Sequence, residues 1–155
     1  MLSTIKNFFE THINAEAKPG ADDLEQRLRI ATVALLLETA RADFNVQDEE
    51  LAAVARHAQA FFQLAPEQTS ELVSLAEQES KNVTSYYEFT SLINDEFTVG
   101  DKVKIIELMW QVAYADNELE KYEEALVRKI ADLLYVPHTQ FIAAKHRVKK
   151  ERGLN

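Results

Sequence analysis

The chain contains no cysteine, and it has only three glycines and three prolines among its 155 residues. Without cysteine there can be no disulfide framework, no thiolate metal site and no cysteine nucleophile, and the cytoplasm is the compartment expected by default. The scarcity of helix breakers, combined with many Ala, Leu, Glu and Gln residues, favours helix almost throughout. A chain of this length can bury a sizeable core as one domain without covalent staples.

Long apolar runs are also missing. The longest candidate, IATVALLL, is much shorter than the roughly 20 residues that a membrane-spanning helix needs. The N-terminal stretch MLSTIKNFFETHINAEA lacks a charged segment followed by an apolar one, so it predicts no secretory signal. We therefore expect a cytoplasmic protein whose contact with a membrane, if it makes one, is peripheral and at the inner face.

Positive charge is in short supply as well. The formal net charge is −9, which argues against nucleic acid as a partner because phosphate neutralisation requires clustered Lys and Arg. The C-terminal stretch KHRVKKERG is a local exception. It is typical of a solvated last helical turn whose cations complement the helix dipole, and the alternative interpretation is a contact with an anionic partner or membrane surface.

The hydrophobic pattern has helical spacing and no sustained alternation of period two, so the sequence predicts an all-α fold. We expect a single domain of two pseudo-symmetric helical hairpins with flanking helices over 21–151, preceded by an amphipathic arm and loop at 1–20. The broadest apolar stripes lie in 22–42 and 100–115, which we expect to form the core pair. The other predicted helices are 2–14, 48–63, 66–80, 84–96, 121–135 and 138–151.

Two acidic stretches, ETARADFNVQDEELAAV and QVAYADNELEKYEEALV, share one layout. An offset of 73 places Ala40, Ala42, Asp43, Val46 and Glu50 on Ala113, Ala115, Asp116, Leu119 and Glu123. The same offset places Arg56, Ala58 and Phe61 on Lys129, Ala131 and Leu134. The shared pattern indicates an internal duplication of a helical hairpin.

The spacing from Asp43 to Glu50, and from Asp116 to Glu123, matches positions 5 and 12 of an EF-hand loop. Each copy supplies only the second half of such a loop, so this is an analogy of spacing. Carboxylate oxygens favour Ca²⁺ or Mg²⁺ over zinc, and these four residues are therefore the predicted metal ligands. With the residue at position 9, which is Gln47 or Glu120, each half-loop offers three ligands. Three are too few for calcium, so waters would complete the shell, or the two copies would share one ion.

Helix capping explains the same residue types without any ion. A carboxylate near the third position of a helix satisfies free backbone N–H groups, and aspartate can bond loop amides. The sequence leaves both interpretations open. An EF-hand-like loop also needs a left-handed turn at position 6, which Asn117 adopts more readily than Phe44. The first copy would therefore bury the Phe44 ring in compensation or have a different turn.

The segments ARADFNVQDEE and AYADNELEKYEEALVRKIADLLYV resemble the two characteristic segments of the TerB-like tellurite-resistance family, and the likeness covers roughly residues 25–148. The family's usual A-D-G is replaced here by Asp43-Phe44 and Asp116-Asn117. The resemblance implies paired helical hairpins with an acidic surface that binds calcium or magnesium. It also implies a setting of tellurite and general stress resistance, with no established reaction.

Catalytic signatures are absent from the sequence. The four histidines have no partner at metal-ligand spacing, and no nucleophile elbow, phosphate loop or H-E-x-x-H occurs. We therefore expect a non-enzymatic interaction module with a protein partner. The alternatives are a purely structural helical domain without a ligand and, less favoured, a metal-dependent hydrolase that uses the carboxylates as ligands.

Overall fold

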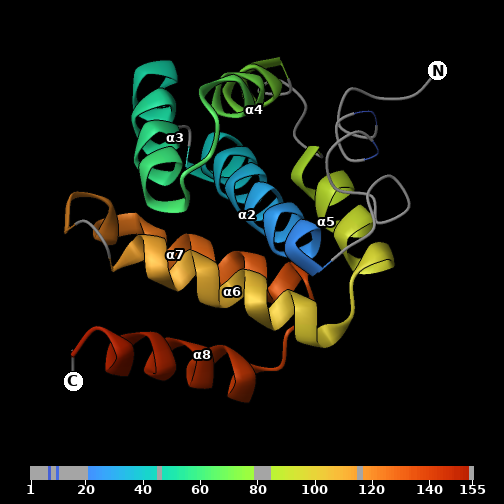
Figure 1. The fold of residues 1–155 in the computed structure, drawn as a ribbon, viewed down its shortest axis with the longest axis vertical. Coiled ribbons are helices and arrows are strands. Elements are labelled where there is room, and N and C mark those ends of the chain that lie inside the picture. The colour runs from blue at the N-terminus through green and yellow to red at the C-terminus, as the bar shows by residue number, and fades with distance from the viewer. Residues whose placement is uncertain are drawn as a thin grey trace.

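A computed structural model of the chain describes residues 21–44, 47–78, 85–114 and 117–153, together with Asn7 and Glu10. Within these ranges there are seven helices and no strand, which confirms the predicted all-α fold (Figure 1). The helices are α2 (Ala21–Phe44), α3 (Asp48–Phe62), α4 (Pro66–Gln78), α5 (Ser85–Glu96), α6 (Val99–Ala113), α7 (Asn117–Leu133) and α8 (His138–Glu151). The predicted arm at 1–20 lies outside the described residues except for Asn7 and Glu10, which are helical and exposed.

The core is built around α2 and α6, as the apolar stripes predicted. Every residue from Ile30 to Ala40 is buried, and α6 contributes Ile105, Met109 and Trp110 among other buried side chains. The two helices cross and pack on each other (Figure 1). Because α2 is covered on nearly all sides over this length, it is the central helix of the molecule.

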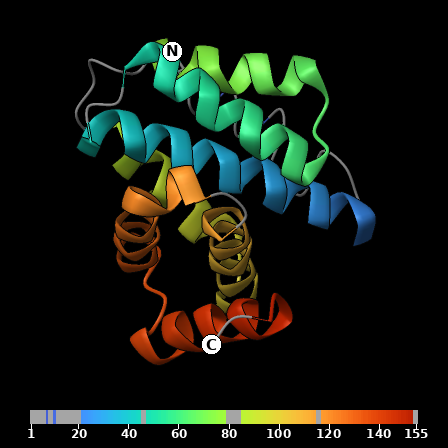
Figure 2. The same cartoon turned by 90° about the vertical axis from the view of Figure 1, so that its left-hand side faces the viewer.

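The remaining helices cover this pair from two ends. Helices α3 and α4 pack on α2 and on each other, α5 packs on α2, and α7 and α8 pack on α6. As a result, α3 and α4 lie at one end of the molecule and α8 at the other (Figures 1 and 2). A partly buried polar chain ties α5, α6 and α7 together: Lys102 Nζ donates to Asn94 Oδ1 at 3.0 Å, and Asn94 Nδ2 donates to the Leu133 carbonyl at 3.0 Å.

The internal repeat extends to three helices, one more than the predicted hairpin. Helices α3 and α7 end in the same way, with left-handed residues at Gln63 (φ 58°) and Tyr135 (φ 59°). The next backbone N–H returns to the carbonyl five residues earlier, from Leu64 to Gln59 and from Val136 to Ala131, both at 3.0 Å. This is the Schellman arrangement of a helix C-terminus. A proline then opens the third helix of each unit, at the start of α4 and immediately before α8.

The register of the repeat differs from the predicted one. Buried positions in α3 and α7 coincide at an offset of 72: Val54, Ala55, Ala58 and Phe62 match Leu126, Val127, Ile130 and Leu134. An offset of 73 would match buried Ala55 with exposed Arg128, a rotation of about 100° around the helix axis. The predicted equivalence of Glu50 with Glu123 is therefore wrong, as are the pairings of Arg56, Ala58 and Phe61 with Lys129, Ala131 and Leu134. The second unit therefore has one residue fewer from its Ala-x-Ala-Asp motif to the buried positions of its second helix.

The two junctions also differ in where their helices end. Helix α2 continues through Phe44, whereas α6 stops at Ala113 and α7 begins at Asn117, four residues before the predicted start at 121. Glu118 and Glu120 lie in the first turn of α7, where acidic residues complement the helix dipole, and this favours the earlier start. Phe44 and Asn117 both belong to helices, so the predicted left-handed turns at these positions are wrong.

Candidate metal site

Glu50 caps the N-terminus of its own helix. It is the third residue of α3, its side chain is exposed, and one carboxylate oxygen accepts the backbone N–H of Gln47 at 3.1 Å. This bond satisfies one of the backbone donors that the first turn leaves without a partner. The capping interpretation therefore accounts for Glu50, and its second carboxylate oxygen remains available for another ligand in this geometry.

The other three predicted ligands cannot be placed around a common point. Asp116 lies outside the described residues, and so do the side chains of Asp43 and Glu123. Their backbone positions are known in two cases: Asp43 is in the last turn of α2, and Glu123 is the seventh residue of α7. Glu123 thus lies beyond the first turn, so the predicted capping position near the start of its helix is wrong.

In the described part of the chain, no three His, Asp or Glu side chains are grouped so that they could hold a metal ion. Glu50 is the only predicted ligand with a described side chain, and it fits helix capping without an ion. Ligation of Ca²⁺ or Mg²⁺ by Asp43, Glu50, Asp116 and Glu123 therefore stays a prediction.

One buried acid near the first junction escaped the sequence prediction. Glu38 is 2% exposed and lies on α2 about one turn before Asp43. A carboxylate is rarely buried unless it has partners, and Glu38 does interact with neighbouring groups. The signal in the sequence was an acid within the continuous apolar stripe of 22–42, whereas the prediction considered only the acids around the junction.

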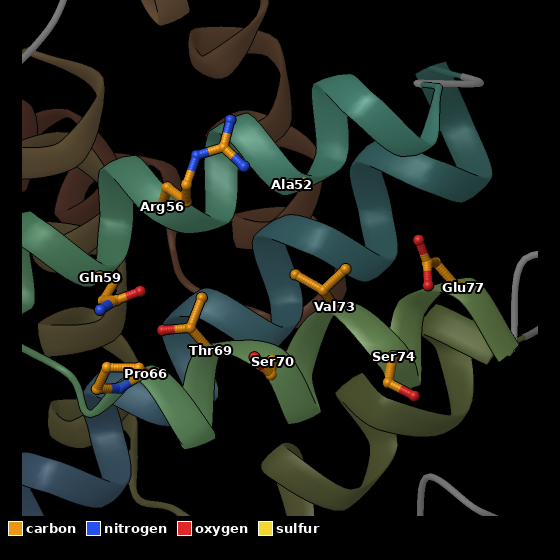
Figure 3. Close-up of a pocket in the computed structure, with 9 residues that line it drawn as sticks. All are labelled: Ala52, Arg56, Gln59, Pro66, Thr69, Ser70, Val73, Ser74 and Glu77. Atoms are coloured by element: carbon orange, nitrogen blue, oxygen red, sulfur yellow. The ribbon is translucent and has the colours of Figure 1, made fainter.

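A groove runs between α3 and α4 on the outer side of the first unit (Figure 3). Its volume is 420 Å³, and its walls are Ala52, Arg56, Gln59, Pro66, Thr69, Ser70, Val73, Ser74 and Glu77. Figure 3 shows Thr69, Val73 and Glu77 projecting from α4 toward α3. The sequence prediction did not find this groove because its residues are small or ordinary surface types that follow no ligand-binding motif.

The helical repeat with its two acidic junctions agrees with a family model that matches the chain. The model, Tellurite resistance protein TerB, matches residues 29–146 and so extends from the middle of α2 into the last helix. The chain belongs to the TerB family. The resemblance inferred from the acidic segments is thereby confirmed.

No curated protein matches this TerB-family chain, and neither does any solved structure. Among the described residues, no helix is long and apolar enough to cross a membrane. Family membership therefore agrees with the helical fold, and it identifies neither a ligand nor a partner for this chain.

Proposed function

We propose that this TerB-family domain is a non-enzymatic, cytoplasmic interaction module that binds Ca²⁺ or Mg²⁺ at its acidic junctions in a tellurite-resistance or stress setting. The family match supports the setting, since the matching model is described as a tellurite resistance protein. The shared Ala-x-Ala-Asp sequence, with further acids after it at both helix–helix junctions, supports the cation, because carboxylate oxygens are the ligands that these ions prefer.

The position of Glu50 supports a coupling between the ion and the fold. This carboxylate already accepts a backbone N–H at the first turn of α3, and a cation on its second oxygen would be held directly against that helix end. Occupation of the junction would then fix the relative position of α2 and α3. A partner that recognises the ordered junction would bind only when the ion is present.

The test is thermal unfolding with and without each ion. A ligand at about 100 times its dissociation constant stabilises the folded state by about 2.7 kcal/mol, which corresponds to an increase in Tm of about 5–10 °C for a domain of this size. Millimolar Ca²⁺, Mg²⁺ and Mn²⁺ are compared in buffer that has been freed of metal. Calorimetric titration then gives the stoichiometry.

Two variants separate ion binding from capping. Asp116→Ala should abolish the increment in Tm, whereas Asp132→Ala, an exposed acid near the other end of α7, should keep it. If Asp116→Ala lowers Tm equally with and without the ion, the acids act as caps only. An unchanged wild-type Tm in all three ions would retire the proposal.

A further inference from the structure

The third helices of the two units carry opposite charge. Helix α4 contains Glu67, Glu71 and Glu77 and no Lys or Arg. Helix α8 contains Lys145, Arg147, Lys149 and Lys150, with Glu151 as its only acid. At the offset of 72 that aligns the second helices, Glu77 falls on Lys149. The duplicated helices have therefore diverged into an acidic and a basic surface on a chain whose net charge is −9.

Part of the positive charge on α8 is used within the molecule. Lys145 Nζ lies 3.7 Å from a carboxylate oxygen of Glu124, and Arg147 Nε donates to Glu107 Oε2 at 2.8 Å. Lys149 and Lys150, by contrast, form no ion pair within the described part of the chain, and Lys150 is exposed. These two cations in the last turn are available to an acidic partner.

The helices on either side of the α3–α4 groove carry negative charge, opposite to that of α8. The walls of the groove are formed largely by small side chains, and Arg56 is the only cation among its lining residues. Exposed carboxylates lie along both helices that form it, at Glu49 on α3 and at Glu67 and Glu77 on α4. These carboxylates along the two helices that border the groove favour the face of a helix that carries basic side chains.

The second unit carries larger side chains at the positions equivalent to Thr69 and Val73. At the same offset, Thr69 and Val73 correspond to Phe141 and Lys145, and Arg56 corresponds to Arg128. There the Arg128 guanidinium lies over the Phe141 ring at 5.9 Å, and Lys145 lies over the Trp110 ring at 5.3 Å. In the first unit these positions hold the smaller Thr69 and Val73, and the groove that they line is open to another molecule.

The α3–α4 groove and helix α8 lie at opposite ends of the molecule and cannot meet within one chain (Figures 1 and 2). We propose that α8 of one copy docks in the α3–α4 groove of a second copy, with Lys149 and Lys150 over the carboxylates of α4. Such a contact joins two different surfaces and can propagate from copy to copy. It does not depend on the cation proposed above.

The experiment is sedimentation velocity on the full chain over a concentration series, with a chelator present so that no divalent ion bridges the copies. At about 50 mM salt we expect species heavier than the 17.7 kDa monomer. At about 500 mM salt we expect the monomer, because the Debye length falls well below its value of about 10 Å at 0.1 M. A monomer at every concentration in low salt overturns the proposal, and so does association that salt leaves unchanged.

Charge reversal identifies the surfaces. Glu67→Lys/Glu77→Lys and Lys149→Glu/Lys150→Glu should each raise the dissociation constant at least about tenfold, and mixing the two variants should restore association. The control Asp95→Lys/Asp132→Lys makes the same charge change at exposed sites away from both surfaces and should associate like the wild type or more strongly, since it lowers the net negative charge.

Circular dichroism checks that each variant is folded. If Glu67→Lys disturbs the first turn of α4, Glu67→Gln/Glu77→Gln carries the same prediction with a smaller effect. If Lys149→Glu/Lys150→Glu associates as strongly as the wild type, these lysines only complement the helix dipole or bind a different partner. This result would overturn the proposal. Failure of the mixture to associate would do the same.

Discussion

The buried ammonium of Lys102 makes the stability of the domain depend on a single amide side chain. Lys102 is 7% exposed, and its Nζ donates to Asn94 Oδ1, whose own Nδ2 donates to the carbonyl of Leu133. Asn94→Leu keeps the number and branching of the side-chain heavy atoms but removes both bonds. It leaves a largely buried cation without its acceptor and a helix-end carbonyl without its donor.

The expected cost follows from these two losses. A buried polar group without a partner costs about 1–3 kcal/mol, and a charged group costs more, so Asn94→Leu should destabilise the domain by about 3 kcal/mol. Lys102→Met removes the cation together with its desolvation penalty and should cost about 1 kcal/mol or less. The double variant should be more stable than Asn94→Leu alone, which gives a coupling of about 1–2 kcal/mol.

Urea denaturation followed by circular dichroism measures all three variants, with Lys104→Met on the partly exposed side of α6 as the control. For a domain of this size, 3 kcal/mol corresponds to a decrease in Tm of about 6–12 °C. If the stability losses of Asn94→Leu and Lys102→Met add up to the loss of the double variant within about 0.5 kcal/mol, then Lys102 reaches water in solution. The argument from its burial is then refuted.

Two further substitutions test local geometry. Trp110 is 1% exposed, and its indole N–H finds no hydrogen-bond partner among the described residues, so Trp110→Phe removes an unsatisfied donor. Urea denaturation should show a loss of stability below about 2 kcal/mol for Trp110→Phe, against about 3–5 kcal/mol for Trp110→Ala, and equal losses would contradict this. Tyr135 is 77% exposed and has a φ of 59°. Tyr135→Gly should therefore relieve left-handed backbone strain and raise the stability by up to about 1 kcal/mol. A lower Tm for this variant would show that the ring contributes more to stability than the strain costs.

Helix positions could be predicted from the sequence because local signals coincide with the tertiary fold. Pro66 opens α4, Pro137 immediately precedes α8, and the broad stripes of 22–42 and 100–115 became the buried pair. The start of α7 was placed four residues late because the acids around Asp116 suggested a loop. Acids within a first helical turn are favourable, and a single sequence does not distinguish that arrangement from a loop of ligands.

The register of the repeat could not be found from matching letters alone. The shared Ala-x-Ala-Asp pattern fixes an offset of 73 before the junction, and Glu50 then appears to match Glu123. The burial of Ala55 and Val127 at an offset of 72 decides otherwise. Burial is a property of the packed pair of helices, and apolar residues at neighbouring positions of α7 permit either alignment until the packing is known.

The roles of the side chains at the candidate metal site could not be predicted from sequence spacing either. A carboxylate at the third position of a helix fits a cap and a ligand equally well by spacing, and only the bond from Gln47 N to Glu50 reveals the cap. The α3–α4 groove depends on the absence of large side chains at Thr69 and Val73. Small residues at these two positions are unremarkable in the sequence until they are compared with the larger Phe141 and Lys145 at the equivalent positions of α8.

The burial of α2 along its whole central length makes each three-helix unit depend on the other. One three-helix unit alone would expose the face that α2 presents to α6, and this face includes some of the most apolar side chains of the chain. A single unit would therefore need a second one to cover that face. In this chain the two units cover each other within one polypeptide, with α5 in the connection between them. Because the two units are joined, their corresponding helices need not be identical, and α4 and α8 carry opposite charge.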